Sequence, residues 1–311
     1  MKRIQYHKYG GPEVMQIGDF ELSAPSKGEV SVHVKFAAIN PIDWKLRTGQ
    51  MKLVTGRNFP RAMGMDFSGT VISVGPEVTR LKPGDAVFGL ARFKESGALA
   101  EALVTKETFV ARKPDNVSFE EAACLGTPGV TAWNGLVDKG KLRAGQHVFI
   151  NGCSGAVGRA AVQIARLLGA TVSGSCSAQD IEQVRTLGVQ DAYDYRNMEL
   201  QTLNHQFDIV YDTAATLSVD AGIALLRPKG VFLDLNPGLG KFLRAVYDRR
   251  LKPVIGSPRV DILDKLADAA SAGQLRIPVG RTVQLSGAIQ LIADLEQGHK
   301  SGGKGLVALE Q

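Results

Sequence analysis

The sequence lacks long apolar runs and paired cysteines. Its apolar stretches end well short of the roughly 20 residues that a membrane-spanning helix needs. The three cysteines, Cys124, Cys153 and Cys176, form no Cys-x-x-Cys pair, which argues against a disulfide framework and a structural zinc cluster. The first residues, MKRIQYHKYGGPEV, contain neither the apolar core of a secretory signal nor the Arg- and Ser-rich pattern of a transit peptide. We therefore expect a protein of the reducing cytoplasm.

The sequence also lacks a concentration of charge of either sign. The formal net charge is +6, but the basic residues are scattered, without a basic tail or a repeat of aromatic and basic residues. Nucleic acid is therefore not an expected partner. A weak positive field favours anionic small molecules, and charge that only keeps the protein in solution explains the same composition.

Two patterns divide the chain. Residues 1–117 hold short strand-like runs separated by Gly and Pro, such as EVSVHVKFAAI and GDAVFGL. Residues 118–255 alternate between strand-like and helix-like segments, which predicts parallel βαβ units. Residues 256–311 return to short elements, and we expect them to complete the first domain. The predicted fold class is α/β, with a barrel-like β domain and a doubly wound parallel sheet.

A glycine-rich loop, NGCSGAVG, follows the apolar run HVFI and precedes a helical pattern. Gly152, Gly155 and Gly158 let the backbone approach a pyrophosphate, and the helix N-terminus offers free N–H groups. The spacing departs from Gly-x-Gly-x-x-Gly, and a glycine-rich turn without a ligand is the alternative. The strand–loop–helix context predicts a dinucleotide site. The other contacts expected in this segment are Ser154, Ala156 and Val157.

The second strand of this unit favours NADPH over NADH. An NAD site usually has an acid about 20 residues beyond the loop, whereas the same count from Gly155 reaches Ser175, which does not repel a 2′-phosphate. Asp180, in contrast, lies close enough in sequence to oppose a phosphate. Additional donors and one positive charge are expected from Ser177, Tyr195 and Arg196. A solvated loop charge is the alternative for the arginine.

Eight segments, in a fixed order along the chain, carry a resemblance to a known family. They are YGGPEVM (9–15), INPIDWKLRTG (39–49), GMDFSGTVISVG (64–75), LKPGDAVFG (81–89), LGTPGVTAW (125–133), NGCSGAVGRAAVQIARLLGA (151–170), DIVYDTAA (208–215) and LIADLEQGHKSGGKGLVAL (291–309). On these segments the chain resembles the medium-chain dehydrogenase/reductase superfamily, in its zinc-independent, zeta-crystallin-like quinone oxidoreductase branch. Each motif alone is weak, but their joint order is specific.

The resemblance implies a fold, an activity and an assembly. Residues 1–117 and 256–311 would form a GroES-like β-barrel catalytic domain, and residues 118–255 a Rossmann NADP(H)-binding domain, with the active site in a cleft. Members of the branch reduce quinones or α,β-unsaturated carbonyls with NADPH, often as homodimers. In zinc-dependent members of the superfamily, two cysteines and a histidine bind the catalytic ion. The matching positions here are Asn40, Met65 and Thr127, which are poor zinc ligands, so we expect no catalytic metal.

Three residues after the strand-like run EVSVHVKFAAI are the candidate catalytic groups. Hydride transfer to an activated double bond needs no metal, because the enolate that forms needs only hydrogen-bond donors. Asn40 is the candidate polar group near the nicotinamide ribose or the substrate oxygen, and Lys45 is a candidate proton donor. Asp43 is expected to orient either Asn40 or Lys45. An Asn-Pro turn, a local helix cap and an ordinary surface lysine are the respective alternatives.

Further cofactor contacts are expected at loop and strand ends. Thr127 and Thr131 precede or open a helix, and helix capping is the alternative for both. Asp212, Thr213 and Asn236 follow strands at the edge where such sheets bind ligands, and plain loops are the alternative.

The leading hypothesis is an NADPH-dependent, metal-free reductase of small-molecule quinones or enals. A rival enzyme is an enoyl-thioester reductase of the same superfamily. A rival of another class is a catalytically weak protein that senses NADPH or binds single-stranded RNA, against which the scattered charge weighs.

Overall fold

The structure is a computed structural model that describes residues 1–236 and 238–309. It divides into two compact units: unit 1 comprises Met1–Thr127 and Pro258–Gln311, and unit 2 comprises Pro128–Ser257. The sequence placed the first boundary earlier, at 117. The difference arises because α3 (Phe119–Ala123) packs on strands of unit 1, where the Ser68 hydroxyl donates to the Phe119 carbonyl at 2.6 Å.

Unit 1 is built on two β-sheets. A small sheet has the order β2-β1-β4, and a seven-stranded sheet has the order β15-β16-β3-β5-β6-β8, with β7 pairing to β3. The strands are β1 (Lys2–Tyr6), β2 (Met15–Asp19), β3 (Glu29–Ala38), β4 (Arg61–Ala62), β5 (Asp66–Val74), β6 (Ala86–Leu90), β7 (Ala102–Lys106), β8 (Val110–Arg112), β15 (Val279–Gln284) and β16 (Lys304–Ala308). The helices are α1 (Pro41–Arg47), α2 (Lys52–Thr55), α3, α9 (Val260–Ser271) and α10 (Ala288–Glu296), and α4 (Gly126–Trp133) starts here.

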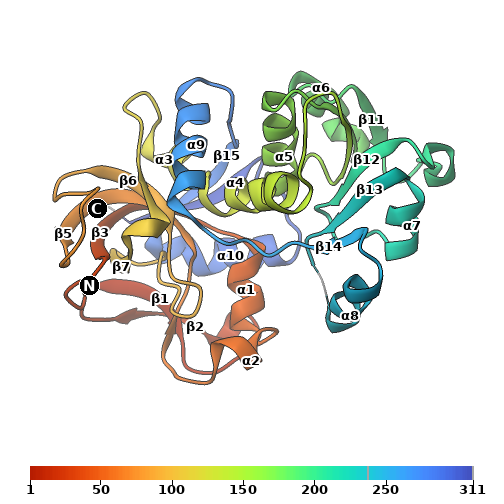
Figure 1. Ribbon diagram of the computed structural model, residues 1–311. Coiled ribbons are helices and arrows are strands. Elements are labelled where there is room, and N and C mark those ends of the chain that lie inside the picture. Colours follow the sequence, from red (N-terminus) through yellow and green to blue (C-terminus); the bar gives the residue numbers. More distant parts are fainter. Residues whose placement is uncertain (237, 310–311) are drawn as a thin grey trace. The chain divides into compact units, whose positions relative to one another are not determined.

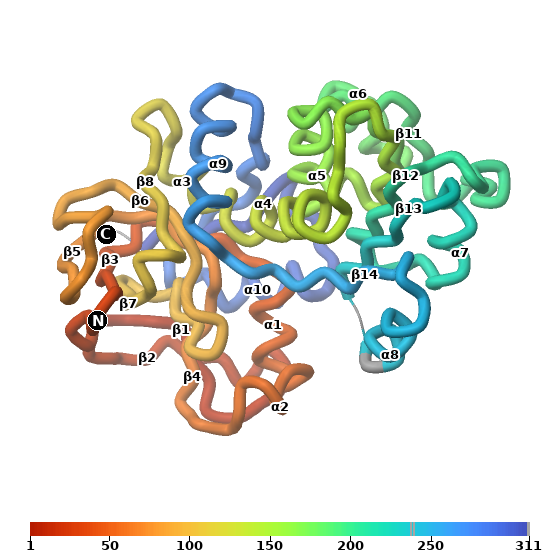
Figure 2. Tube along the Cα trace, viewed as in Figure 1, coloured from red at the N-terminus to blue at the C-terminus, as the bar shows by residue number. Residues whose placement is uncertain are grey.

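Strand β3 organises the larger sheet. One edge of β3 pairs with β5 along most of its length; the other edge pairs with β7 near Ser31 and with β16 near Ala37, so two strands share it. The C-terminal strand β16 thereby completes a sheet that begins near the N-terminus. Figure 2 traces this return of the chain to unit 1, where β16 lies beside β3. A buried apolar core that includes Val32, Phe67 and Leu291 fills the space between the sheet and α10.

Unit 2 is a six-stranded parallel sheet with the order β11-β10-β9-β12-β13-β14. Its strands are β9 (His147–Asn151), β10 (Thr171–Cys176), β11 (Asp191–Asp194), β12 (Phe207–Asp212), β13 (Leu226–Asp234) and β14 (Leu251–Pro253). Its helices are α5 (Ala156–Leu167), α6 (Ile181–Thr186), α7 (Val219–Ala224) and α8 (Leu239–Tyr247). The strand order reverses between β9 and β12, so right-handed crossovers place α5 and α7 on opposite faces (Figure 1).

The sequence explains this sheet. Val148, Phe149 and Ile150 of β9 are completely buried because β9 has a strand on each side and helices on both faces. The predicted fold class, a β-rich domain with a doubly wound parallel sheet, is confirmed. The reversal of strand order puts the carboxyl ends of β9, β10 and β12 together, where open α/β sheets bind ligands.

Candidate functional site

The glycine loop joins β9 to α5, as the sequence predicts. Gly152 has a φ of +82°, and a Cβ there would lie 2.8 Å from the Ala214 Cβ. A Cβ on Gly158 would lie 2.1 Å from the Gly152 carbonyl oxygen. The chain itself therefore requires these two glycines. A Cβ on Gly155 would lie 3.5 Å from the Gly152 oxygen, an ordinary contact, so Gly155 leaves room that protein atoms do not fill.

The loop presents backbone donors at the start of α5. Gly155 caps the helix, and Ala156, Val157 and Gly158 form its first turn, where N–H groups have no intrahelical acceptor. Arg159 is 8% exposed, and its Nε donates to the Ser154 carbonyl at 2.7 Å. This hydrogen bond holds the loop against the first turn of α5. Burial lowers the pKa of Arg159. Backbone donors, a helix N-terminus and a nearby guanidinium together fit a diphosphate.

A buried polar network lies at the carboxyl edge of the sheet. The Asn151 amide donates to Asp212 at 2.7 Å and accepts from the Ser175 hydroxyl at 2.6 Å. The Thr213 hydroxyl donates to the Asn151 carbonyl at 2.7 Å. Asp212 also accepts the Leu217 N–H at 2.9 Å. The structure therefore brings the predicted Ser175, Asp212 and Thr213 together.

Two of these residues do not offer a surface to a ligand. Ser175 is 1% exposed and Asp212 is completely buried. Their partners are protein groups, because Asp212 holds the loop after β12 and Ser175 links β10 to β9. Both side chains are held by protein groups, and their contact with a cofactor stays a prediction.

The predicted 2′-phosphate residues gather beyond β10. The Tyr195 N–H donates to the Cys176 carbonyl at 3.0 Å, which brings the loop after β11 to the end of β10. Both Tyr195 and Arg196 are exposed, and the arginine lies 5.2 Å from the centre of the tyrosine ring. The Ser177 hydroxyl donates to the Asp180 carboxylate at 2.7 Å. The expected cation and the opposing acid thus flank the same strand end.

Two other predicted contacts have different environments. Thr131 is 5% exposed, and its carbonyl accepts the buried Tyr211 hydroxyl at 2.9 Å, so Thr131 supports the core of unit 2. Asn236 is exposed after β13, and its N–H donates to Asp234 at 2.9 Å.

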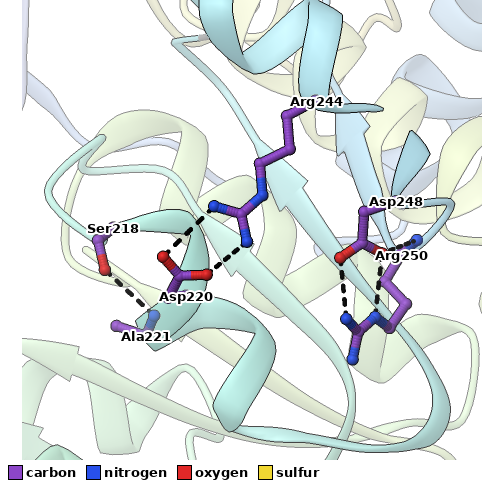
Figure 3. Close-up of polar contacts among 6 residues, drawn as sticks. All are labelled: Ser218, Asp220, Ala221, Arg244, Asp248 and Arg250. Carbon is purple, nitrogen blue, oxygen red and sulfur yellow. Dashed lines mark hydrogen bonds and ion pairs between the residues drawn. The ribbon is translucent and has the colours of Figure 1, made fainter. Parts of the chain in front are cut away.

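Helix α8 follows the carboxyl end of β13 and is attached by its charged side. Lys241 pairs with Asp234 at 2.5 Å, and Arg244 pairs with Asp220 of α7 (Figure 3). In the same view the Ser218 hydroxyl accepts the Ala221 N–H that starts α7, and Arg250 pairs with Asp248 at 2.9 Å. The opposite side of α8 exposes apolar residues: Phe242, Leu243, Val246 and Tyr247. The helix therefore turns its apolar side outward.

A second polar cluster is buried in unit 1 around Asp66. The Asn40 Nδ2 donates to Asp66 at 3.0 Å and to the Ala38 carbonyl at 3.1 Å. The Asn40 Oδ1 accepts from Lys304 Nζ at 2.5 Å. Both the N–H and the hydroxyl of Thr127 donate to Asp66 Oδ1, at 2.8 and 2.6 Å. Because both N–H groups of the Asn40 side chain donate to protein oxygens, Asn40 fits the role of a positioning residue better than that of a hydrogen-bond donor to the substrate.

Asp43 and Lys45 lie on α1, directly after Asn40. Asp43 Oδ2 accepts the Asn40 N–H at 2.7 Å, which caps the helix as a local cap would. Its Oδ1 has no hydrogen-bond partner among residues 1–236 and 238–309. Lys45 is half-buried on the same helix.

Burial controls the electrostatics of this cluster. Desolvation raises the pKa of Asp43 to about 7, although the hydrogen bond from Asn40 lowers it. By smaller amounts, the charge of Asp66 raises this pKa and the charge of Lys304 lowers it. Desolvation also raises the pKa of Asp66, while Lys304 and the hydrogen bonds from Thr127 and Asn40 lower it. Lys304 is thus the cation that opposes the burial of two carboxyl groups.

The positions predicted to match the zinc ligands of relatives hold side chains that contact other groups of the protein. The Asn40 amide oxygen accepts from an ammonium, Met65 is buried with its sulfur 3.9 Å from the Ser96 hydroxyl, and Thr127 donates to Asp66. Within residues 1–236 and 238–309, no three His, Cys, Asp or Glu side chains are grouped as metal ligands. Burial raises the pKa of all three cysteine thiols, that of Cys124 to about 12, which disfavours the thiolate.

Sequence reasoning missed four residues of these clusters: Asp66, Asn151, Arg159 and Lys304. Asp66 and Lys304 are each the only charged residue of the strand that they start, and Arg159 lies among small buried residues of α5. A charged residue in an apolar segment was the available signal, since such residues are rarely buried without a partner. A hollow of about 280 Å³ lined by Asn116, Glu121 and residues 270–273 contains none of the predicted site residues.

Comparisons with known proteins agree with this architecture. Residues 26–115 match the alcohol dehydrogenase GroES-like domain, and residues 187–304 match a zinc-binding dehydrogenase domain. The chain is 30% identical to the NADPH-dependent alkenal/one oxidoreductase of Arabidopsis thaliana, over 91% of this chain and 79% of the relative. It is 27% identical to a chloroplast envelope quinone oxidoreductase homolog of the same plant, over 97% of each. The quinone oxidoreductase structure from Coxiella burnetii superposes with a TM-score of 0.89 and 29% identity, over 100% of this chain and 99% of that one.

The chain belongs to the medium-chain dehydrogenase/reductase superfamily, among its quinone oxidoreductases. The predicted resemblance is confirmed, and the β-rich unit is GroES-like. No helix within the described residues has the length and apolar character to cross a membrane.

Proposed function

We propose that this protein is an NADPH-dependent reductase of quinones or α,β-unsaturated carbonyls that works without a metal. The glycine loop, whose Gly155 leaves unfilled space before backbone donors, is the observation that carries the proposal. The names of the relatives, a quinone oxidoreductase and an NADPH-dependent alkenal/one oxidoreductase, support the same activity.

Unit 2 is proposed to bind NADPH, which supplies the hydride when bound. Ser154, Gly155 and the first turn of α5 would hold the diphosphate, with Arg159 keeping the loop in place. Arg196 and Tyr195 would hold the 2′-phosphate, and Ser177 keeps the Asp180 carboxylate engaged. Because the positive charge of Arg196 would attract the 2′-phosphate and the negative charge of Asp180 would repel it, we propose a preference for NADPH rather than an absolute requirement.

Unit 1 is proposed to be the catalytic domain. Lys45 would donate a hydrogen bond to the carbonyl oxygen as negative charge develops on it, because it is a cation on the helix that Asp43 and Asn40 start. Asn40 would act through its buried contacts as a positioning residue.

The donor set around Asn40 supports the proposal of a reaction without metal. An ammonium already occupies the amide oxygen, and the carboxylate of Asp66 has three protein donors. Hydrogen-bond donors suffice for an enolate, whereas alkoxide formation calls for a Lewis acid. Activity is therefore expected to withstand a chelator.

The substrate is proposed to be flat and largely apolar. Helix α8 exposes Phe242, Leu243 and Val246 just beyond the carboxyl end of β13, the edge at which sheets of this kind bind ligands. A quinone or enal fits such a surface better than a charged metabolite does.

We also propose a cytoplasmic homodimer that does not bind nucleic acid. Strand β14 ends the parallel sheet, and among the described strands its only partner is β13, so its other edge is open to a second copy. Three free, buried cysteines suit a reducing compartment. Light scattering tests the dimer, and filter binding with single-stranded RNA across a salt series tests the nucleic acid, with no retention expected at moderate salt.

Oxidation of NADPH and NADH against a panel of acceptors tests the function. The panel is 9,10-phenanthrenequinone, 1,4-benzoquinone, crotonaldehyde and crotonyl-CoA, each with and without chelator. We expect turnover of at least one quinone or enal, with NADPH preferred and no loss on adding chelator. Turnover of crotonyl-CoA alone would favour an enoyl-thioester reductase, and binding of NADPH without turnover of any acceptor would favour a sensor.

A further inference from the structure

Lys304 and Asp66 are charged, buried and without a part in the mechanism above. Lys304 is 6% exposed at the start of β16, and its Nζ donates to the Ile39 carbonyl at 2.6 Å and to Asn40 Oδ1. Asp66 is completely buried at the start of β5. Burying an ion pair of this kind offers little net stability, so a role in orienting other groups is worth testing.

The two groups at the ends of this hydrogen-bond network, the Lys304 ammonium and the Ala38 carbonyl, determine which group donates in each hydrogen bond. A lysine ammonium only donates and a backbone carbonyl only accepts, so the Asn40 oxygen faces Lys304 and its nitrogen faces Ala38 and Asp66. Asp66 then receives N–H groups from Asn40 and from the Thr127 backbone. With these donors on both of its oxygens, Asp66 is suited to accept the Thr127 hydroxyl hydrogen as well, at 2.6 Å.

This arrangement determines what Thr127 offers outside the cluster. Its side chain is partly exposed, and its only hydroxyl hydrogen points inward to Asp66. Its oxygen therefore presents lone pairs, and not a hydrogen, to a ligand. Burial raises the pKa of Asp66, and the charge of Lys304 and the hydrogen bonds from Thr127 and Asn40 oppose that rise.

We propose that Lys304 and Asp66 are positioning residues that make the Thr127 hydroxyl a hydrogen-bond acceptor for an amide or hydroxyl donor of bound NADPH. The nicotinamide carboxamide and the adjoining ribose hydroxyls are donors of this kind. The inference rests on the proposed function, since it takes NADPH as the ligand.

Fluorescence titration of NADPH into wild type and variants tests the proposal, with Tm, kcat and KM measured for each protein. Thr127→Val removes the acceptor and is expected to weaken binding about tenfold, whereas Thr127→Ser keeps it and stays within about threefold. Lys304→Met is expected to weaken binding several-fold. Lys113→Met is the matched control, because Lys113 also donates to two backbone carbonyls of unit 1 but touches no acid of the cluster.

The double variant Lys304→Met/Thr127→Val distinguishes orientation from simple stabilisation. If Lys304 acts through the threonine hydroxyl, Lys304→Met adds less than about twofold to the dissociation constant once that hydroxyl is gone. An equal effect in both backgrounds would overturn the role of Lys304. If Lys304→Met does not fold, Asp66→Asn is measured in its place, because it replaces one acceptor oxygen with a donor and is expected to weaken binding as Thr127→Val does.

The 3-acetylpyridine analogue of NADPH, which has no amide donor, identifies the donor. Loss of the Thr127→Val effect with this analogue assigns the carboxamide, and persistence assigns a ribose hydroxyl. NADPH binding by Thr127→Val as tight as by wild type would overturn the inference. A wild-type protein that binds no NADPH would instead refute the proposed function, so the two failures are distinguishable.

Discussion

The glycine loop of unit 2 and the Asp66 cluster of unit 1 are formed by different chemical groups. The loop uses backbone N–H groups and the absence of Cβ atoms, whereas the cluster uses buried charged side chains that hold one another. A backbone site depends on local sequence, since its parts are consecutive. A side-chain site depends on distant segments, because Asn40, Asp66, Thr127 and Lys304 lie on four separate parts of the chain.

The largest expected effect comes from Gly158→Ala in the loop. Its Cβ would lie 2.1 Å from the Gly152 carbonyl oxygen, so the strand–helix junction must shift. We expect the free energy of unfolding to fall by about 2–3 kcal/mol and NADPH binding to be lost. Thermal unfolding and nucleotide titration check both, and an unchanged Tm would contradict the packing requirement.

Gly155→Ala sharpens the comparison inside the same loop. Its Cβ meets nothing closer than 3.5 Å, so the fold should tolerate it, with a change in unfolding free energy below about 1 kcal/mol. NADPH binding should weaken by at least about tenfold, because the methyl group enters the space left for the diphosphate. Binding equal to wild type would show that no ligand approaches Gly155.

Asp43 in unit 1 and His147 in unit 2 are expected to change the stability of the fold with pH in opposite directions. The pKa of Asp43 is raised to about 7 from an ordinary 3.8, so the fold favours the neutral carboxyl group. This stabilisation is complete below about pH 4 and is lost as the pH rises through about 7. His147 in unit 2 has a lowered pKa and the opposite sign, so its contribution grows as the pH rises.

The matched variant for this test is Asp43→Asn, compared with wild type at pH 5 and pH 8 by thermal unfolding. We expect the variant to gain stability relative to wild type between these values, because it carries no proton to lose. His147 is present in both proteins and cancels in the difference. Equal pH profiles would show that Asp43 ionises in the fold as it does in water.

The smallest effects are expected at the exposed end of β10. Arg196→Gln should weaken NADPH binding about threefold to tenfold and leave NADH binding unchanged, since an exposed ion pair contributes little. Asp180→Asn should shift the preference further toward NADPH, because it removes the acid that opposes the phosphate. Steady-state kinetics with both nucleotides checks the pair, and a parallel change for NADPH and NADH would exclude a 2′-phosphate contact.

The comparison also explains how much could be predicted from the sequence. Consecutive patterns predicted the β-rich and doubly wound parts, the family and the position of the glycine loop, because strand and helix periodicity is local. Burial depends on neighbours in space, so the sequence could not predict that protein atoms surround Ser175, Thr131 and Asp212, whose contact with a ligand stays a prediction. Lys304 was missed because its partner Asn40 lies at the other end of the chain.

The account depends most directly on whether the loop before α5 binds a pyridine nucleotide in the absence of metal. Isothermal titration of NADPH into protein that has been dialysed against chelator measures this. We predict binding heat with saturation at one nucleotide per chain and weaker binding of NADH. Absence of heat with either nucleotide, in a protein whose thermal unfolding is cooperative, would contradict the account.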